Sequence, residues 1–318
     1  MLFNDTMKNL IKYLLTLMTC FFILATGIKA QEFFPLWPKD QMPNSKGLHH
    51  GDSIVNERAI QIGIPGFYAF FPSKDDNNGA AILIFPGGGY HHLTYNLGGF
   101  QLAKWFNTMG MSAFVVNYRL PTSPDLQKRE IGPLQDAQRA MRIIRANTVK
   151  WKINPNKIGV QGSSAGGHLA AMMGNLREDI SRIKDTLDAV SFNADFMVLV
   201  SPVITMGSNA HKGSKTNLLG DNPSQSTMDK YSMELQVTAT TPPCFIADAF
   251  NDKTVPPINS LLFYKALLDK NISTSFHVFP QGGHAIGLSN NPGSTEQWKS
   301  LCEAWLKEMK FIEPISSK

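Results

Sequence analysis

Residues 162–166 read Gly-Ser-Ser-Ala-Gly, which fits the Gly-x-Ser-x-Gly pattern of a serine nucleophile. An apolar run, 158–160, precedes this pattern, and a helix-forming stretch, 167–173, follows it. A strand, a sharp turn and a helix in this order would raise the hydroxyl of Ser164 above a sheet edge, with glycines where the turn leaves no room for Cβ. The N-terminus of the helix would favour developing negative charge. Ser163 is the alternative nucleophile, but it is out of register with the glycines.

A serine hydroxyl is a poor nucleophile at neutral pH and needs a histidine base that is held by an acid. His284 lies in a glycine-rich loop, 281–287, after the last predicted strand. Asp252 lies in the loop after the preceding strand, and Asp248, nearer to that strand, is the alternative acid. The order serine, acid, histidine along the chain is the order that this kind of nucleophile turn requires. We therefore predict a catalytic triad of Ser164, Asp252 and His284.

Residues 86–90, with the sequence Pro-Gly-Gly-Gly-Tyr, directly follow the first predicted buried strand. Glycines let the backbone approach a substrate closely, and an oxyanion needs preorganised N–H donors. We predict that Gly88, Gly89 and Ala165, the residue after the nucleophile, donate these hydrogen bonds. A phosphate-binding loop is the alternative, but no Lys-Ser/Thr follows and the spacing is not Gly-x-Gly-x-x-Gly.

Other residues near these motifs have simpler expected roles. Tyr90 and His91 follow the glycines and are candidate substrate contacts, with packing as the alternative for the tyrosine. His168, in the helix after the nucleophile, is expected to pack beneath the turn. No set of His, Asp, Glu or Cys has the spacing of a zinc site, so we expect neither a metal nor a cofactor.

The elements that must position these residues follow from the apolar pattern. Short apolar runs predict strands at 81–85, 113–116, 157–160, 196–200, 245–247 and 275–279. Apolar residues at helical spacing predict helices at 134–144, 169–176, 258–268 and 298–309. Continuous apolar runs suit strands that are buried on both faces, and their alternation with helices indicates crossover units. The sequence therefore predicts an α/β fold with a mostly parallel central sheet and helices on both faces.

Two segments depart from this alternation. Residues 31–65 are rich in Pro, Gly and Asn and are expected to wrap around the domain. Residues 205–240 are polar, with one expected helix near 226–235. This second segment forms either a partial, cap-like cover over the site or an ordinary surface excursion.

Residues 1–30 have the pattern of a secretory signal peptide. Lys8 and Lys12 provide the basic flank, and residues 14–25 are almost continuously apolar. A retained membrane anchor is the alternative. We expect residues 31–318 to form a single exported domain, in the periplasm or outside the cell.

The composition limits the class of protein. The 318 residues are 43% hydrophobic and 17% charged, so the chain can bury a large core. The net charge of +5 is small and spread along the chain, which argues against a nucleic-acid partner. Beyond the N-terminal segment no apolar run is long enough to span a membrane. Export leaves Cys244 and Cys302, which we expect as separate buried thiols rather than a disulfide.

Several motifs together resemble one known group. They are residues 36–38 (Leu-Trp-Pro), 86–90, 117–121 (Asn-Tyr-Arg-Leu-Pro), 136–140 (Asp-Ala-Gln-Arg-Ala), 162–168, 218–223, 251–256 and 282–284. In this order the chain resembles the exported bacterial α/β-hydrolases of the acetylxylan-esterase and feruloyl-esterase-like type, over roughly 34–310. The resemblance implies an α/β-hydrolase fold with its nucleophile at Ser164, its acid at Asp252 and its base at His284. Pro86 stands where related lipases carry histidine, which argues against a hormone-sensitive-lipase-like protein.

The expected function is hydrolysis of a carboxylic ester, with acetyl groups on a plant polysaccharide such as acetylxylan as the substrate. A prolyl-oligopeptidase-like peptidase is an alternative, although residues 31–318 leave no room for the additional propeller domain of that class. A glycan-binding protein without activity is a second alternative, which the three triad residues disfavour. An endoxylanase would need two carboxylates on either side of the scissile bond, and no such pair is apparent.

Overall fold

The computed structural model describes residues 31–284 and 286–313, so the expected signal peptide lies outside the described residues. The fold lies in the unit that begins at Phe33.

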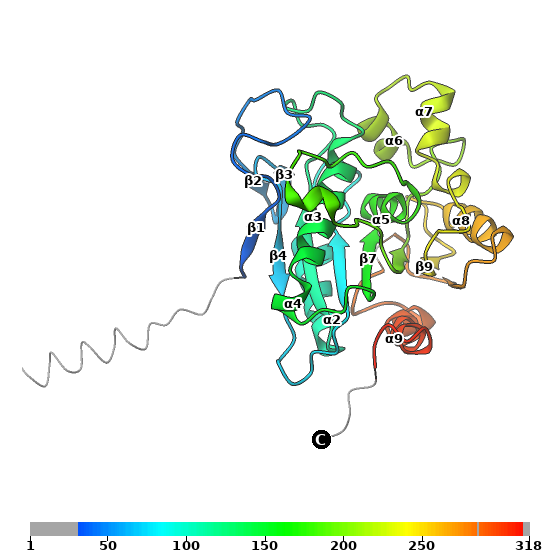
Figure 1. Cartoon of the computed structure of the whole chain (residues 1–318). Coiled ribbons are helices and arrows are strands. Elements are labelled where there is room, and N and C mark those ends of the chain that lie inside the picture. The colour runs from blue at the N-terminus through cyan, green and yellow to red at the C-terminus, as the bar shows by residue number, and fades with distance from the viewer. Residues whose placement is uncertain (1–30, 285, 314–318) are drawn as a thin grey trace, which may run out of the picture. The chain divides into compact units, whose positions relative to one another are not determined.

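An eight-stranded sheet forms the centre of this unit, in the order β1-β4-β6-β5-β7-β8-β9-β10 (Figure 1). The six predicted strands are confirmed, with ends shifted by a few residues, and they form the parallel part: β5 (Ala81–Phe85), β6 (Ser112–Asn117), β7 (Ile158–Ser163), β8 (Met197–Val200), β9 (Cys244–Ala249) and β10 (Thr274–Phe279). β4 (Gly66–Phe70) and β1 (Phe33–Pro35) extend the sheet by antiparallel pairing, and the sequence did not predict them.

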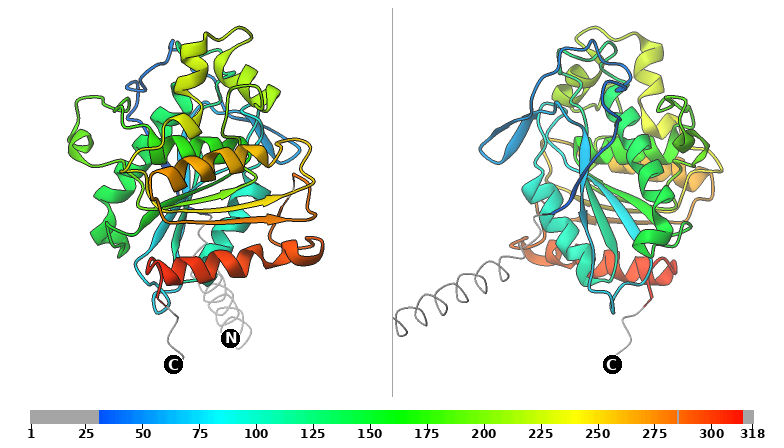
Figure 2. Two further views of the ribbon diagram at one scale, coloured as in Figure 1. Left: turned by 90° about the vertical axis from the view of Figure 1, so that its right-hand side faces the viewer. Right: turned by 60° about the vertical axis from the view of Figure 1, so that its left-hand side comes forward.

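Helices cover both faces of the sheet, as expected (Figure 2). One apolar layer lies between the sheet and α3 (Gly132–Ala146), α5 (Ala165–Asn175) and α8 (Ile258–Asp269). A second layer lies under α2 (Gln101–Thr108) and α9 (Trp298–Glu308). The four predicted helices are confirmed. The sequence analysis missed α2, the short π-helical turn η1 (Asn96–Phe100) before it, α4 (Thr148–Trp151), η2 (Thr186–Ala189) and η4 (Gly293–Gln297).

The strands are buried because their side chains are apolar on both sides, as in β5, where all five residues are buried. In α3 the apolar residues at helical spacing point to the sheet, and Leu134, Ala137, Met141 and Ile144 are buried. Each large aliphatic side chain of this kind contributes about 1.5–3 kcal/mol by leaving water. Because these strands are parallel, their carboxyl ends lie at one edge of the sheet, where the loops that follow them come together.

Three motifs that lie far apart in the sequence meet in one buried network. The indole Nε1 of Trp37 donates a hydrogen bond to Asp136 at 2.8 Å, and the Arg119 guanidinium forms an ion pair with the same carboxylate at 2.8 Å. Arg119 also donates to the carbonyl of Pro43 at 2.7 Å. Because a buried charge is stable only when it is paired, this network attaches the segment after β1 to α3.

The two segments that depart from the alternation of strands and helices, 31–65 and 205–240, contain short strands and helices of their own. Residues 53–61 form a two-stranded hairpin of β2 (Ser53–Val55) and β3 (Arg58–Gln61), and Ala59 forms an isolated antiparallel bridge with Leu93.

The insertion at 205–240 holds α6 (Lys212–Leu219), α7 (Gln225–Lys230) and η3 (Met233–Leu235). The helix predicted near 226–235 is thus present but shorter, since α7 ends at Lys230, and α6 was not predicted. The helix ends at Lys230 because tertiary hydrogen bonds occupy the next residues: His168 Nε2 donates to the Tyr231 carbonyl at 2.8 Å, and the Ser232 hydroxyl accepts from the Met206 amide at 2.9 Å.

Cys244 in β9 and Cys302 in α9 are both buried and unbonded, which confirms the prediction of separate thiols. Among residues 31–284 and 286–313, no helix has both the length and the apolar character needed to cross a membrane.

Candidate active site

The predicted nucleophile turn is present. β7 ends at Ser163 and α5 begins at Ala165, and Ser164 between them has φ 56° and ψ −125°. This backbone conformation is strained for a residue with a side chain, and strain of this kind is common at functional sites.

Both glycines of the motif are required by space. A Cβ on Gly162 would lie 2.0 Å from the Gly166 carbonyl oxygen, and one on Gly166 would lie 1.9 Å from that of Phe85. These distances are far below van der Waals contact. The turn can therefore form only with glycine at these positions.

Three side chains from separate loops form an unbroken line of hydrogen bonds. His284 Nε2 lies 2.8 Å from Ser164 Oγ, and His284 Nδ1 lies 2.6 Å from Asp252 Oδ2. Because a carboxylate only accepts, Nδ1 carries the proton, and Nε2 of the neutral ring accepts the hydrogen bond from the serine hydroxyl. This arrangement can take the proton of Ser164 and make its oxygen a nucleophile.

Backbone amides fix the carboxylate in place. The side chain of Asp252 is 0% exposed, and its Oδ1 accepts hydrogen bonds from the amides of Thr254 at 2.9 Å and Val255 at 3.0 Å. The neighbouring Asn251 side chain accepts from the Gly283 amide at 2.8 Å, which joins the acid loop to the histidine loop. The imidazole itself is 23% exposed, so one side of it faces the substrate space.

The alternative acid, Asp248, is placed differently from the expectation. It lies within β9 rather than in the following loop, is fully buried, and accepts hydrogen bonds from Ser260 Oγ at 2.7 Å and the Ala249 amide at 2.8 Å. Burial raises the pKa of its carboxyl to about 6, against the effect of these two donors. The structure therefore brings Asp252, and not Asp248, into contact with His284.

The glycine loop after β5 lies directly beside the nucleophile. A Cβ on Gly87 would lie 3.3 Å from Ser164 Cβ, and Gly88 and Gly89 have φ values of 137° and 63° that L-residues rarely adopt. Ala165 is the first residue of α5, so its N–H has no partner within the helix. Among residues 31–284 and 286–313 no acceptor is found for the amides of Gly88 and Gly89. These three N–H groups are therefore available to a negatively charged oxygen.

The prediction that Tyr90 contacts substrate is wrong. Its backbone has φ 60°, its side chain is 0% exposed, and its hydroxyl donates to His168 Nδ1 at 2.8 Å. Because the Tyr231 carbonyl can only accept, His168 carries its proton on Nε2, and burial lowers the pKa of this imidazole to about 4. His168 thus packs beneath the nucleophile turn, as expected. His91 is exposed, and its role as a substrate contact stays a prediction.

The insertion reaches the glycine loop, which the sequence left open. Asn217 Nδ2, in α6, donates to the Gly89 carbonyl at 2.8 Å. His211, directly before α6, lies with its Cε1 3.9 Å from the point where a Cβ on Gly89 would be. His211 was not predicted as a site residue. No pattern in the sequence marks it, because histidine is not a preferred N-cap residue and its neighbour Gly89 comes from another loop.

The sequence pattern of the BD-FAE family matches residues 69–267, which include the glycine loop, the nucleophile and the acid. The chain belongs to the BD-FAE family. A solved structure, the acetyl ester-xyloside bifunctional hydrolase of Caldicellulosiruptor lactoaceticus, is 34% identical, with a TM-score of 0.77 over 90% of this chain and 100% of that one.

Two further relatives of this BD-FAE protein are similar over part of their length. An acetylxylan esterase of Xylanibacter ruminicola is 32% identical over 240 residues, which is 74% of this chain and 47% of the relative. An endo-1,4-beta-xylanase B of Butyrivibrio fibrisolvens is 36% identical over 230 residues, which is 72% of this chain and 35% of the relative. The chain thus matches less than half of the length of each of these two relatives.

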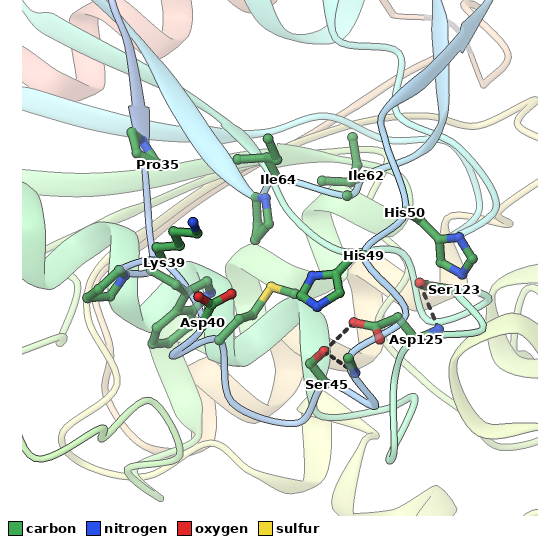
Figure 3. Close-up of a pocket in the computed structure, with 16 residues that line it drawn as sticks. Pro35, Lys39, Asp40, Ser45, His49, His50, Ile62, Ile64, Ser123 and Asp125 are labelled. Carbon is green, nitrogen blue, oxygen red and sulfur yellow. Dashed lines mark hydrogen bonds between the residues drawn. The ribbon is translucent and has the colours of Figure 1, made fainter.

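The protein also has a cavity whose lining includes none of the triad residues (Figure 3). Its volume is about 760 Å³, and the segment after β1, the residues after β3 and the loop 123–125 line it. Pro35 pairs with Gly66, and Gly66 pairs with Asn117 at the end of β6, so the cavity lies beyond the carboxyl end of that strand. Within the described residues no cluster of three or more His, Cys, Asp or Glu could hold a metal ion.

Proposed function

We propose that this protein is a serine carboxylic-ester hydrolase that removes acetyl groups from acetylated xylan or its oligosaccharides. The observation that carries the proposal is the line of hydrogen bonds from Ser164 Oγ through His284 to Asp252, at 2.8 and 2.6 Å. The substrate class is supported by similar proteins, one named as an acetylxylan esterase and one as an acetyl ester-xyloside hydrolase.

In the acylation step His284 Nε2 takes the hydroxyl proton while Ser164 Oγ bonds to the acyl carbon. The carbonyl oxygen becomes an oxyanion and accepts hydrogen bonds from the amides of Gly88, Gly89 and Ala165. The bond between the acyl carbon and the sugar oxygen then breaks, and His284 gives the proton to that departing oxygen, which leaves as a sugar hydroxyl.

In the deacylation step water replaces the sugar. His284 takes a proton from this water as its oxygen bonds to the acyl carbon of the acetyl-serine, and returns the proton to Ser164 Oγ as acetate leaves. Asp252 keeps the ring in the correct tautomer and stabilises its charged form during both steps. Its two backbone donors keep the carboxylate in position throughout.

The organisation of the chain is part of the same proposal. Residues 31–318 form one mature domain after removal of the signal peptide 1–30, and the insertion 205–240 partly covers the site. The contact between Asn217 and the Gly89 carbonyl supports the covering role. Sequencing the N-terminus of the protein recovered from the culture medium or periplasm tests the leader, because a retained residue 1 would contradict its removal.

Replacing the nucleophile tests the activity directly. Ser164→Ala should reduce kcat on p-nitrophenyl acetate and acetate release from acetylated xylan by about 10⁴-fold or more. Ser163→Ala is the matched control and should keep most of the activity, since its hydroxyl only accepts a hydrogen bond from Gln161 at 3.3 Å.

A panel of substrates separates an acetyl esterase from a feruloyl esterase and a peptidase. Feruloyl esters and aminoacyl amides are assayed beside the acetyl esters, and wild type should favour the acetyl esters. An active Ser164→Ala protein would contradict the proposed nucleophile. Release of reducing sugar without acetate would contradict the ester reaction.

A further inference from the structure

The half-buried His211 has a fixed orientation beside the proposed oxyanion site. It is the N-cap of α6, and its Nδ1 accepts a hydrogen bond from the Ser214 amide at 3.2 Å. The Ser214 hydroxyl lies 2.8 Å from the same nitrogen. Because Nδ1 accepts from an amide, the neutral ring carries its proton on Nε2. Nε2 is therefore a hydrogen-bond donor, and it has no partner among residues 31–284 and 286–313.

Burial lowers the pKa of His211, which favours the neutral ring. The imidazole of His284 acts in the same direction, and the Asp252 carboxylate acts in the opposite direction. The ring therefore lies within electrostatic range of both His284 and Asp252. Its Cε1 also lies 3.9 Å from the Cβ position of Gly89. His211 therefore lies beside the glycine loop and within electrostatic range of the base.

This location is on the alcohol side of a bound ester. In the proposed reaction the acyl oxygen points to the amides of Gly88 and Gly89, and the leaving oxygen must reach His284 Nε2 to receive its proton. A donor that lies beside the glycine loop and within electrostatic range of His284 is therefore placed to reach the group attached to the leaving oxygen.

We propose that His211 is a specificity residue, whose Nε2–H donates a hydrogen bond to a hydroxyl or ring oxygen of the sugar that carries the acetyl group. The inference rests on the proposed function. It makes the insertion a part of the substrate site, because α6 supplies the ring and Asn217 holds α6 on the Gly89 carbonyl at 2.8 Å. An ester of an alcohol without such oxygens would gain nothing from this contact.

His211→Asn tests this role and keeps the helix cap, since asparagine is a good N-cap residue. We expect kcat/KM on acetylated xylo-oligosaccharides to fall about five- to tenfold, the ordinary value of one neutral hydrogen bond. On p-nitrophenyl acetate, whose alcohol has no sugar oxygens, kcat/KM should change less than twofold. His211→Ser, which also retains a capping side chain, should give the same pair of results and provides a second variant if the first does not fold.

The matched control is Ser224→Ala in the same insertion. Ser224 is the N-cap of α7 and accepts from the Thr227 amide at 3.1 Å, so its loss weakens a cap without removing the imidazole. The ratio of the two activities should stay at the wild-type value in this control. Equal losses on both substrates in His211→Asn, or no loss on either, would overturn the inference. Wild-type turnover of p-nitrophenyl acetate, and its absence in Ser164→Ala, tests the proposed function independently.

Discussion

The triad and the 760 Å³ cavity lie at the same edge of the sheet but are constructed differently. At the triad every side chain has a hydrogen-bond partner: Ser164 and Asp252 each contact His284. Around the cavity, within the described part of the chain, Lys39 and Asp40 make no ion pair or side-chain hydrogen bond.

The difference follows from the elements that carry the residues. The triad side chains follow three parallel strands: β7 and β9, which are almost wholly buried, and β10, which pairs with β9 along its whole length. The cavity is lined by segments next to β1 and β3, which are short and lie at or outside the sheet edge. Asp125 fixes one wall of the cavity, because it accepts hydrogen bonds from Ser45 Oγ and from the amides of residues 46 and 48. The triad thus depends on parallel strands of the main sheet, whereas this wall of the cavity depends on the buried carboxylate of Asp125.

The largest expected effect sharpens this contrast at the triad. Asp252→Asn should reduce kcat on p-nitrophenyl acetate by about 10⁴-fold, because the neutral amide favours the wrong tautomer of His284. Asp248→Asn is the matched control and should retain activity within threefold, since Asp248 contacts Ser260 and not the imidazole. Comparable losses in both variants would show that the two carboxyls act together.

Asp248 should instead affect the dependence of stability on pH. Its native pKa of about 6 exceeds the unfolded value near 4, so the stabilisation it gives is complete below pH 4 and is lost as pH rises through 6. Between pH 4 and pH 8 the free energy of unfolding of wild type should therefore fall by about 3 kcal/mol relative to that of Asp248→Asn. Urea denaturation of both proteins at the two pH values measures this, and parallel pH profiles would refute it.

Tyr90→Phe tests the correction at the glycine loop. Loss of the hydroxyl leaves His168 Nδ1 buried without a donor, so the free energy of unfolding should fall by about 1–3 kcal/mol. The KM for p-nitrophenyl acetate should stay within twofold of wild type, because the buried hydroxyl does not reach substrate. Thermal denaturation and steady-state kinetics give both values. A large rise in KM with unchanged stability would restore the original prediction of substrate contact.

The smallest effect is expected at the cavity. Asp125→Ala removes the acceptor of the Ser45 hydroxyl and of two amides, and water can replace part of this loss, so we expect a destabilisation of about 1 kcal/mol. Turnover of p-nitrophenyl acetate should not change, because the triad depends on other strands. A substantial fall in kcat with the folded population intact would break the separation between the two regions.

Most of the chemistry could be predicted because it depends on residue types in a fixed order. The glycines at 162 and 166 are required by backbone contacts below 2.1 Å, so the motif itself encodes the turn. The parallel strands were evident because they are continuous apolar runs. β1 was missed because it is an edge strand of three residues, and β4 because its sequence, Gly-Phe-Tyr-Ala-Phe, is not a continuous aliphatic run.

Side-chain placement by tertiary contacts could not be predicted. The positive φ of Tyr90 turns its ring into the core, which nothing in Gly-Gly-Gly-Tyr indicates. The helix of the insertion ends at Lys230 because His168 and Met206, distant in the sequence, bind the residues that follow. His211 was overlooked for the same reason, since its neighbours Gly89 and His284 come from other loops.

Burial of the free thiols of Cys244 and Cys302 affects how the protein can be produced. Burial raises the pKa of both Cys244 and Cys302 well above the usual range for a thiol, so neither sulfur is a ready thiolate for oxidation or exchange. Maturation of the domain then requires no oxidase or isomerase, and dithiothreitol should leave its melting temperature unchanged. The same fold can be obtained from a reducing cytoplasm or an oxidising exterior.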